Sequence, residues 1–360
     1  MTPLAERLAT RIAASGPITI AEYMADCLLH PEHGYYTTRT PFGRDGDFIT
    51  APEISQMFGE LIGLCLAQAW LDRGAPAPFC LAELGPGRGT LMADIWRATA
   101  RVPGFHDAAQ VTLVEASPQL REVQAQALPN AQPQWCDSVT TLPEMPLFLV
   151  ANEFFDALPI RQFTRTPQSW REYHVGLDND GALSLGLGLD TNLAALSHRL
   201  NDTHPGDVVE LCPAAGPILE IVAQRIAAHD GVAIVIDYGD WRSLGDTLQA
   251  LRAHQPVPVL ETPGQADLTA HVDFEALALA ATAVPGCAVT QMTPQGAFLE
   301  ALGIGPRAAT LAKGLSGDKL TQHLAAYRRL TDPSEMGTLF KTLGLSRAGS
   351  PPVPGLQPWL

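Results

Sequence analysis

The sequence has few charged residues and lacks long apolar runs. Only 17% of its 360 residues are charged, and 38 acidic residues against 23 basic ones give a formal net charge of −15. Such a surface repels nucleic-acid phosphates and attracts basic partners, so a nucleic-acid substrate is disfavoured. No apolar run approaches the roughly 18 residues that a membrane-spanning helix needs, so we expect no membrane insertion.

Cysteine patterns are also missing. The six cysteines are far apart and form no Cys-x-x-Cys pair, so we expect reduced thiols and neither a disulfide framework nor a metal site. Residues 1–12 carry Leu4, Leu8 and Ile12 at helical spacing but no apolar signal segment. We therefore expect an ordinary first helix and a cytoplasmic location, most simply in a bacterium.

The most informative stretch is residues 79–90, where an apolar run leads into a glycine-rich turn and then a helical pattern. The run is short enough for a strand, and residues 91–96 have helical spacing. Gly85, Gly87 and Gly89 thus lie at a strand-to-helix turn, where glycine permits positive φ and lets backbone N–H groups approach a ligand. The turn, which includes Pro86, predicts a cofactor cradle.

Two features of this turn select among ligands. A dinucleotide fingerprint would have its third glycine at Thr90, and the Lys-Ser/Thr pair that ends a phosphate-binding loop is absent. Glu83, two positions before the first glycine, suits a ligand that carries an ammonium group, such as S-adenosylmethionine. A nicotinamide dehydrogenase is accordingly disfavoured, and a glycine turn that only packs a helix on a strand stays the alternative.

Polar side chains follow three further predicted strands, at 110–115, 134–136 and 146–151. The polar or small residues at these strand ends are Glu115, Ala116 and Ser117, then Asp137 and Ser138, then Asn152 and Glu153. Because ligands of open α/β sheets collect at the carboxyl ends of the strands, we expect these groups to converge on one crevice.

Glu115 is the predicted acceptor for the ribose hydroxyls of the cofactor, and Asp137 with Ser138 suits the adenine amino group. The alternatives are that Glu115 caps the following helix and that Asp137 caps a turn. Upstream, residues 41–50 form a polar, glycine-containing segment that predicts a mobile lid. Residues 50–53 then predict a capping box, and the helix start with Thr50 and Pro52 is expected to face the cofactor.

Segments outside the core have other patterns. Tyr35 and Tyr36 form a Gly-Tyr-Tyr turn, for which packing on the core is favoured over lining a site. Residues 160–187 read as strands with a hairpin turn, and the polar segment 241–271 is too long for an ordinary connection, which favours a functional role. The tail after Ser350 is proline-rich and need not be ordered.

Taken together, these patterns predict an α/β fold in five consecutive parts. They are N-terminal helices with the lid (1–60), the first half of the cofactor-binding core (61–159), a β-hairpin and helix insertion (160–205), the second half of the core with a long substrate-side loop (206–349) and the tail (350–360).

Six segments together resemble the MidA-type family of methyltransferases, which includes a mitochondrial arginine methyltransferase that assists complex I assembly. They are residues 30–36, 46–60, 83–90, 115–118, 151–159 and 264–274. The resemblance implies a class I, Rossmann-like methyltransferase core with a mainly parallel sheet and S-adenosylmethionine as methyl donor. It also implies an arginine acceptor on a complex I core subunit. Because no clear targeting segment is present, a bacterial complex I is the expected counterpart.

An arginine acceptor needs carboxylates. A guanidinium stays protonated at ordinary pH, so its nitrogen becomes a nucleophile only if anions hold it and accept charge as a proton leaves. Glu153 and Asp156 share a face if a helical turn follows the fourth strand. The alternative is that Asn152 or Asp156 caps that turn. His271, in the long polar segment, is a third candidate as an acid, base or orienting group, with a structural role as its alternative.

Other functions stay open at this stage. A methyltransferase that modifies another protein residue or a small molecule would share every cofactor residue and differ only at the acceptor. A non-catalytic assembly chaperone that retains the fold is the third alternative, which an intact turn at residues 83–90 disfavours. The sequence leaves the oligomeric state, the acceptor and the degree of methylation undetermined.

Overall fold

The computed structural model describes residues 2–38 and 50–359. The predicted lid at 41–50 therefore lies outside the described residues, except for Thr50. The chain divides into two compact units. Unit 1 comprises Met1–Phe48, Asp156–Ala215 and Arg242–Asp273, and unit 2 comprises Ile49–Phe155, Gly216–Trp241 and Phe274–Leu360. Each unit thus combines several segments that are separate in the sequence.

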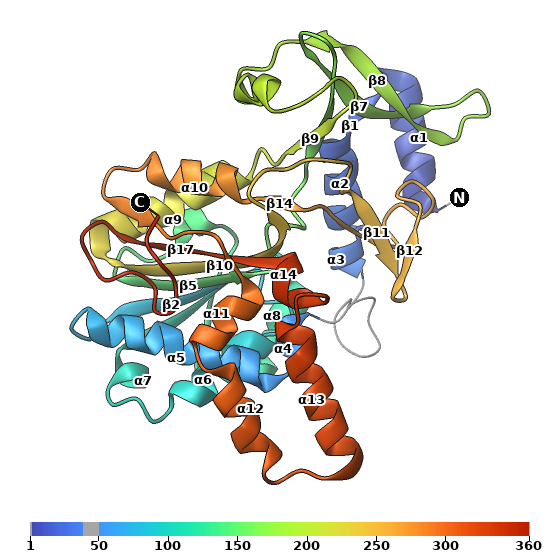
Figure 1. The fold of residues 1–360 in the computed structure, drawn as a ribbon. Helices are drawn as coiled ribbons and strands as arrows, with labels where there is room; N and C mark the ends of the chain where they lie inside the picture. Colours follow the sequence, from blue (N-terminus) through green and yellow to red (C-terminus); the bar gives the residue numbers. More distant parts are fainter. Residues whose placement is uncertain (1, 39–49, 360) are drawn as a thin grey trace. The chain divides into compact units, whose positions relative to one another are not determined.

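Unit 2 is built on a mainly parallel sheet in the strand order β15-β17-β10-β5-β2-β3-β4, with β16 paired to β17 (Figure 1). Its strands are β2 (Phe79–Leu84), β3 (Ala109–Val114), β4 (Gln134–Cys136), β5 (Leu147–Asn152), β10 (Gly231–Asp240), β15 (Cys287–Val289), β16 (Thr293–Pro294) and β17 (Phe340–Arg347). Strands β10, β5, β2, β3 and β4 run parallel, and β17 runs antiparallel to β10. The α/β fold with a mainly parallel sheet is confirmed.

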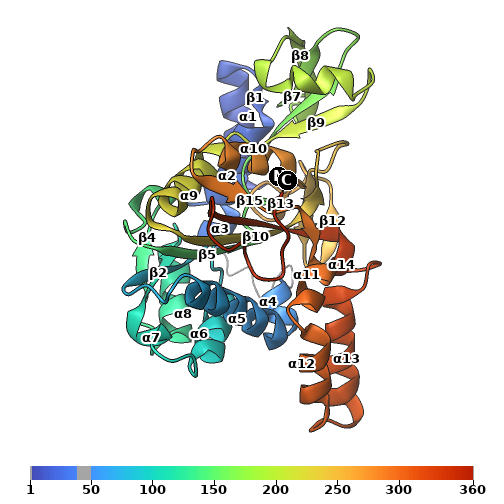
Figure 2. The same ribbon diagram turned by 60° about the vertical axis from the view of Figure 1, so that its left-hand side comes forward.

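The central strands are buried on both faces, because helices cover the sheet on each side. The helices are α4 (Ala51–Ile54), α5 (Gln56–Asp72), α6 (Thr90–Thr99), α7 (Phe105–Ala108), α8 (Pro118–Ala127), α9 (Ala215–His229), α10 (Phe274–Thr282), α11 (Gln295–Ala301), α12 (Ile304–Ala312), α13 (Gly317–Thr331) and α14 (Met336–Leu339), with a 3₁₀ turn η1 (Val139–Thr141). Helices α5, α6 and α8 lie on one face and α9 and α10 on the other, while α12 and α13 lie side by side (Figure 2).

Helices α5 and α6 approach closely because small residues line the contact. A Cβ atom at Gly59 would lie 2.5 Å from the Asp94 Cβ, and one at Gly63 would lie 2.9 Å from the Ile95 Cα. Beside them the buried Glu60 carboxylate accepts hydrogen bonds from Arg97 and Arg307, each at 2.8 Å. These contacts fix α5, which carries much of the apolar core, against α6 and α12.

The predicted capping box at residues 50–53 is wrong. The Thr50 side chain makes no capping hydrogen bond, and α4 ends at Ile54. Ser55 has extended backbone angles and begins a second helix, α5, where its hydroxyl accepts a hydrogen bond from the Met57 N–H at 3.2 Å. The single predicted helix is therefore two helices that meet at Ser55.

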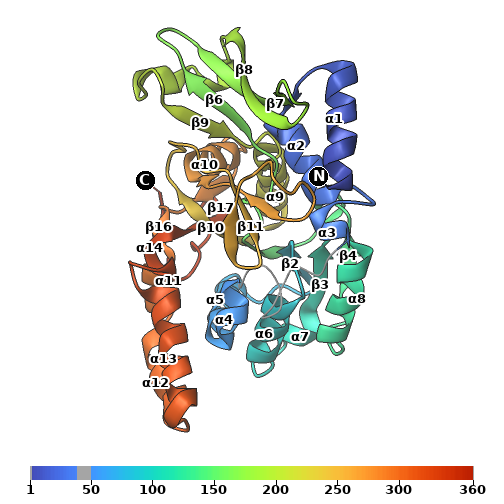
Figure 3. The same cartoon turned by 90° about the vertical axis from the view of Figure 1, so that its right-hand side faces the viewer.

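Unit 1 contains two antiparallel sheets and the N-terminal helices (Figure 3). One sheet has the order β1-β7-β6-β9 with β8 on β7, and the other has the order β12-β11-β13. The elements are α1 (Pro3–Ser15), β1 (Ile18–Thr19), α2 (Ile20–Leu29), α3 (Tyr35–Thr38), β6 (Arg161–Arg165), β7 (Trp170–Leu177), β8 (Leu183–Thr191), η2 (Ala194–Leu196), η3 (His198–Asn201), β9 (Val208–Leu211), β11 (Gln249–Arg252), β12 (Gln255–Val257), β13 (Asp267–Thr269) and β14 (Val272–Asp273).

Several local predictions for unit 1 are confirmed. Leu4, Leu8 and Ile12 are buried along α1, and β7 and β8 form the expected hairpin, with Leu177 opposite Leu183. The segment 241–271, predicted only as a long polar stretch, contains the small sheet β11 to β13. Tyr35 and Tyr36 begin a short helix rather than a turn.

The proline-rich tail packs on unit 2. Val353 and Leu356 are buried and belong to its apolar core, although the sequence alone gave no reason to expect order after residue 350. Gly344 of β17 makes room for them, since a Cβ atom there would lie 2.8 Å from a methyl carbon of Val353. In the part of the chain that is described, no helix is both long and apolar enough to cross a membrane.

Candidate functional site

The turn between β2 and α6 has the backbone geometry that its glycines predict. Gly85, Gly87 and Gly89 have φ values of 60°, 51° and 81°. The Gly89 N–H donates to the Pro86 carbonyl at 2.7 Å, and the Gly85 N–H donates to the Val114 carbonyl at 3.0 Å. Gly89 is also the N-cap of α6 and offers no side chain there. The turn is thus held tightly while its backbone is left uncovered by Cβ atoms.

The Glu83 side chain is more buried than that of a residue that contacts a ligand at the protein surface. Its side chain is buried at the end of β2, and burial raises the pKa of the carboxyl to about 8, an effect that the Met92 backbone N–H opposes in part. Met92 belongs to the first turn of α6, so Glu83 stabilises a helix start that Gly89 does not cap. Among the described residues, its Oε2 has no hydrogen-bond partner.

Glu115 follows β3 and is fixed by two donors. The Ser117 N–H donates to its Oε1 at 2.8 Å, and the Gln124 side-chain amide donates to its Oε2 at 3.1 Å. Burial raises the pKa of Glu115, and the Ser117 hydrogen bond opposes that rise. Glu115 therefore also has the alternative role that the sequence left open, which is to accept a hydrogen bond at the start of α8. Each oxygen keeps a second lone pair, which suits the predicted contact with ribose hydroxyls.

Gln124 is a residue of this region that sequence reasoning missed. Its side chain is fully buried on α8 and donates to the Gly87 carbonyl at 2.8 Å as well as to Glu115. The Trp135 indole N–H donates to its oxygen at 2.8 Å. Gln124 thereby ties the glycine turn, the end of β3 and strand β4 together. The available signal was a polar residue on the otherwise apolar side of an amphipathic helix.

The ends of β3 and β4 present the other predicted cofactor residues. Ser117 is the N-cap of α8, where its hydroxyl accepts a hydrogen bond from the Leu120 N–H at 3.4 Å, and Ala116 before it is exposed. Asp137 is exposed and pairs with Arg121. The Ser138 hydroxyl caps the short helix η1. Asp137 is thus reachable by a ligand, while Ser138 also has a structural role.

Asn152 and Glu153 end β5 at the same edge of the sheet as the glycine turn. Glu153 has a positive φ of 51°, and its Oε1 accepts hydrogen bonds from the Ala51 N–H at 3.0 Å and from the Asn152 amide at 3.1 Å. Glu153 therefore supplies the helix cap that Thr50 does not, and it holds the start of α4, where Pro52 lies. Asn152 is buried, and its Oδ1 lacks a hydrogen-bond partner in the described chain.

The segment after Glu153 is held by Asp237, which sequence reasoning also missed. Asp237 is fully buried in β10, and its Oδ2 accepts hydrogen bonds from the Phe154 N–H at 3.2 Å and the Phe155 N–H at 2.9 Å. The Phe154 ring packs on the glycine turn, since a Cβ at Gly85 would lie 2.8 Å from it. This contact joins the ends of β2 and β5.

The helical turn that Glu153 and Asp156 would need to share one face does not form. Bends and an irregular turn follow β5, and the positive φ of Glu153 directs the chain away from a helix. Glu153 belongs to unit 2 and Asp156 to unit 1. The backbone therefore does not support the argument, drawn from their spacing, that the two carboxylates would hold one guanidinium together.

Asp156 lies in a polar cluster of unit 1. The Ala270 N–H donates to the Asp156 carbonyl at 3.0 Å, next to His271. The Tyr36 hydroxyl donates to the buried Asp267 at 2.8 Å. The pKa of Tyr36 is raised well above its usual value, first by burial and then by the charges of Asp267 and Asp156. The structure thus brings Asp156, Asp267, Tyr36 and the His271 segment together within one unit.

His271 is positioned through its backbone. Its N–H donates to the Thr247 hydroxyl at 2.8 Å, and this hydroxyl in turn donates to the carboxylate of Glu210. Glu210 is buried and also accepts a hydrogen bond from the Gln162 amide at 2.7 Å. A chain of buried polar groups therefore fixes the backbone beside the predicted acid or base.

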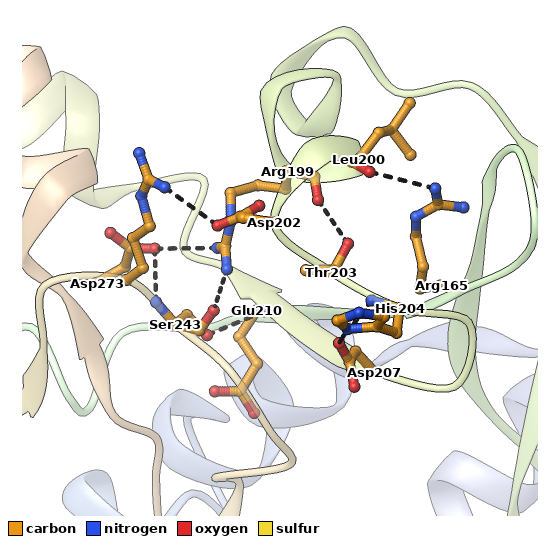
Figure 4. Close-up of polar contacts among 11 residues, drawn as sticks. Arg165, Arg199, Leu200, Asp202, Thr203, His204, Asp207, Glu210, Ser243 and Asp273 are labelled. Atoms are coloured by element: carbon orange, nitrogen blue, oxygen red, sulfur yellow. Dashed lines mark hydrogen bonds and ion pairs between the residues drawn. The ribbon is translucent and has the colours of Figure 1, made fainter.

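A second cluster of polar residues, around Arg199, holds Asp273, which lies two residues after His271 (Figure 4). Arg199 is buried and donates to the Ser243 carbonyl at 2.8 Å, while the Ser243 N–H donates to the Asp273 carboxylate at 2.9 Å. The Asp202 carboxylate forms an ion pair with the Arg199 guanidinium, with an N–O distance of 3.0 Å. No cluster of three or more His, Cys, Asp or Glu side chains within residues 2–38 and 50–359 has the geometry to hold a metal ion.

Comparisons with known proteins agree with this geometry. A family model for S-adenosyl-L-methionine-dependent methyltransferases (Methyltransf_28) matches residues 61–293. "Protein arginine methyltransferase NDUFAF7, mitochondrial" from Danio rerio is 38% identical over 93% of this chain and 85% of its own length. The human protein of that name is 36% identical over 96% of this chain and 83% of its own.

A solved structure extends the similarity to the whole fold. It is a COG1565 superfamily member from Burkholderia thailandensis, bound to S-adenosyl-homocysteine, with a TM-score of 0.82 and 29% identity. The match covers 98% of this chain and 94% of that one. Family model, relatives and fold agree, and the chain belongs to the MidA-type family of S-adenosylmethionine-dependent methyltransferases.

Proposed function

We propose that this chain is a protein arginine N-methyltransferase that acts in the bacterial cytoplasm on a core subunit of respiratory complex I and aids its assembly. The observation that carries the proposal is the identity of 36–38% with relatives named protein arginine methyltransferase, which extends over 93–96% of the chain. The proposal of a complex I subunit as the substrate rests on the family resemblance set out above. The proposed location, the cytoplasm, is the one expected from the sequence.

The residues at the sheet edge fit the cofactor of the family. Bound S-adenosylmethionine supplies an electrophilic methyl group on a cationic sulfonium. At its three glycines the turn has no Cβ atoms between its backbone and a ligand, and Glu83 keeps an oxygen without a hydrogen-bond partner in the described chain. We assign the cofactor-binding role to Thr50, Pro52, Glu83, Gly85, Pro86, Gly87, Gly89, Glu115, Ala116, Ser117, Asp137, Ser138 and Asn152.

The acceptor side needs an anion, because a guanidinium and a sulfonium both carry positive charge. Glu153 lies at the carboxyl end of β5, at the edge of the sheet that carries the glycine turn, and its carboxylate is only partly buried. We assign it the task of orienting the acceptor nitrogen and balancing its charge as a proton leaves. Asp156 and His271, which the unit 1 network fixes, are the further proposed acceptor-side residues.

The test is methyl transfer from radiolabelled S-adenosylmethionine to purified bacterial complex I subunits, followed by mass spectrometry of the labelled peptide. Methylated arginine on a core subunit, absent from cells that lack this protein, is the expected result. Transfer to lysine or to a small molecule alone would replace the acceptor assignment. Binding of S-adenosylmethionine without any transfer would favour an assembly chaperone that retains the fold.

A further inference from the structure

Asp237 is a fully buried carboxylate near the carboxyl end of β10. Ile236, the residue before it, pairs with Asn152 at the end of β5, so Asp237 lies where β5 ends and the segment 153–155 begins. Strand β5 in turn pairs with β2, the strand that leads into the glycine turn (Figure 1). Asp237 is therefore separated from the glycine turn by β5 and is not part of the turn itself.

Both oxygens of this carboxylate accept hydrogen bonds from backbone N–H groups. Oδ2 accepts from the Phe154 N–H at 3.2 Å and from the Phe155 N–H at 2.9 Å, and Oδ1 accepts from the Tyr238 N–H at 3.0 Å. Only a side chain with acceptors on both sides satisfies these donors. An asparagine here would direct its NH₂ group at one set of N–H groups and leave that set without an acceptor. The arrangement is therefore specific for a carboxylate.

The carboxylate stabilises an unfavourable backbone conformation. Glu153, directly before the two phenylalanines, has a φ of 51°, which a non-glycine residue adopts only at an energetic cost. The Glu153 N–H donates to the Ile236 carbonyl at 2.9 Å. The N–H groups of residues 153–155 thus all bind β10, and two of them bind Asp237. Successive N–H groups in a tight turn form a concavity that favours an anion.

Phe154 transmits this restraint to the glycine turn. Its ring lies so close to Gly85 that a Cβ atom there would come within 2.8 Å of a ring carbon. Gly85, the first glycine of the turn, has a φ of 60°. A shift of the Phe154 backbone would therefore move the ring away from the turn or press it into the turn. Asp237, Phe154 and Gly85 all belong to unit 2, so the whole connection lies within one compact unit.

We propose that Asp237 is a positioning residue for cofactor binding: it fixes the backbone of Phe154, and the Phe154 ring fixes the glycine turn. The inference rests on the proposed role of that turn in binding S-adenosylmethionine. It assigns Asp237 no contact with the cofactor or with the reacting atoms. A carboxylate that served the fold alone would change only stability, whereas one that positions the turn also changes the affinity for the cofactor.

The experiment measures the affinity of the full chain for S-adenosylhomocysteine by calorimetry, with Asp237→Asn as the test variant. We expect this variant to bind about tenfold more weakly, because a backbone N–H loses its acceptor and the Phe154 ring loses its fixed place. Val232→Ala is the control for stability, because Val232 is fully buried at the opposite end of β10. It should lower the thermal midpoint and keep the wild-type affinity. Wild-type affinity in Asp237→Asn would overturn the proposal.

A double-mutant cycle tests whether the effect passes through Phe154. Phe154→Leu removes the ring from Gly85 and keeps the backbone N–H that donates to Asp237, so it should weaken binding by itself. Asp237→Asn should then cost little further affinity in the Phe154→Leu background, since the ring that transmits the restraint is gone. Losses of affinity that simply add in the double variant would overturn the proposed route.

Amide hydrogen exchange of the wild type supplies a measurement that needs no variant. Because coupling between two sites is reciprocal, saturation with S-adenosylhomocysteine should slow exchange of the Phe154 and Phe155 amides. Unchanged exchange at these amides would overturn the proposal, even where Asp237→Asn does not fold. A wild type that does not bind S-adenosylhomocysteine would overturn the proposed role of the glycine turn, and this inference with it.

Discussion

The side-chain amide of Gln124 donates a hydrogen bond to the carbonyl of Gly87 at 2.8 Å, and this contact links α8 to the glycine turn. The same amide holds Glu115, so one buried side chain positions both the glycine turn and Glu115, the two motifs that we propose bind the cofactor. We predict that Gln124→Met lowers affinity for S-adenosylmethionine about tenfold, because the turn and Glu115 both lose a donor. Calorimetry measures this, with Gln68→Met, on the exposed face of α5, as the control. Equal affinities for the two variants would contradict the linking role.

The buried Glu83 predicts a pH dependence of stability. Its pKa is raised to about 8 by burial, whereas in the unfolded chain it is near 4.5. Between these values folding takes up a proton at Glu83, so this residue lowers the free energy of unfolding as pH rises, by up to about 1.4 kcal/mol per pH unit. The isosteric Glu83→Gln should remove that slope. Chemical denaturation of both proteins from pH 5 to pH 8 should show their stability difference growing with pH; a constant difference would contradict the raised pKa.

Gly85 combines a positive φ with crowding by Phe154. Gly85→Ala introduces a Cβ 2.8 Å from the Phe154 ring at a φ of 60°, so we expect a loss of roughly 2 kcal/mol of stability and weaker cofactor binding. Gly181→Ala is the matched control, because Gly181 has a φ of 78° but no atom near the added Cβ. It should lose only roughly 1 kcal/mol from backbone strain. Thermal unfolding of the two variants separates the cost of crowding from the cost of backbone strain. Equal losses of stability in both variants would contradict a contribution from crowding.

The Thr247 hydroxyl joins Glu210 to the backbone of His271. Thr247→Val keeps the shape of the side chain and removes this link, while Thr247→Ser keeps the hydroxyl. We expect Thr247→Val to speed exchange of the His271 amide and to raise the KM for the acceptor while cofactor affinity stays unchanged, and Thr247→Ser to restore both. If valine and serine variants behave alike, the hydroxyl has no positioning role.

The sequence predicted the parts of the structure that depend on local patterns of residues. The apolar runs at β2, β5 and β10 and the glycines between β2 and α6 specify a parallel sheet with a glycine turn of positive φ at one edge, because strand length and positive φ are local properties. The β7 and β8 hairpin follows from its turn residues for the same reason.

The failures concern contacts between residues that are far apart in the sequence. Thr50 looked like a helix cap, but Glu153, about a hundred residues later, supplies the cap. In the sequence, nothing links Gln124 to the glycine turn or Asp237 to the end of β5, because these contacts form only in the fold. The condition that Glu153 and Asp156 share a helical turn after β5 is not met, because a non-glycine residue, Glu153, adopts positive φ there, which no local pattern reveals.

The most direct test of the acceptor chemistry is Glu153→Gln. Glu153 accepts hydrogen bonds from the Ala51 N–H and the Asn152 amide on Oε1, and the side-chain carbonyl of a glutamine can accept both. The variant should therefore keep its fold and its cofactor affinity. In the proposed mechanism the variant loses the negative charge that would balance a guanidinium beside a sulfonium, so turnover on a complex I arginine peptide should fall by roughly two to three orders of magnitude.

Two further measurements complete this test. Asp156→Asn should lower turnover less, since Asp156 belongs to the polar cluster of unit 1. The distinguishing readout is kcat with the acceptor at saturation, because loss of charge balance lowers kcat, whereas loss of simple binding raises KM alone. A Glu153→Gln enzyme with wild-type kcat would remove Glu153 from the chemistry. It would leave this residue with a structural task, which is to cap α4 through the hydrogen bond from the Ala51 N–H.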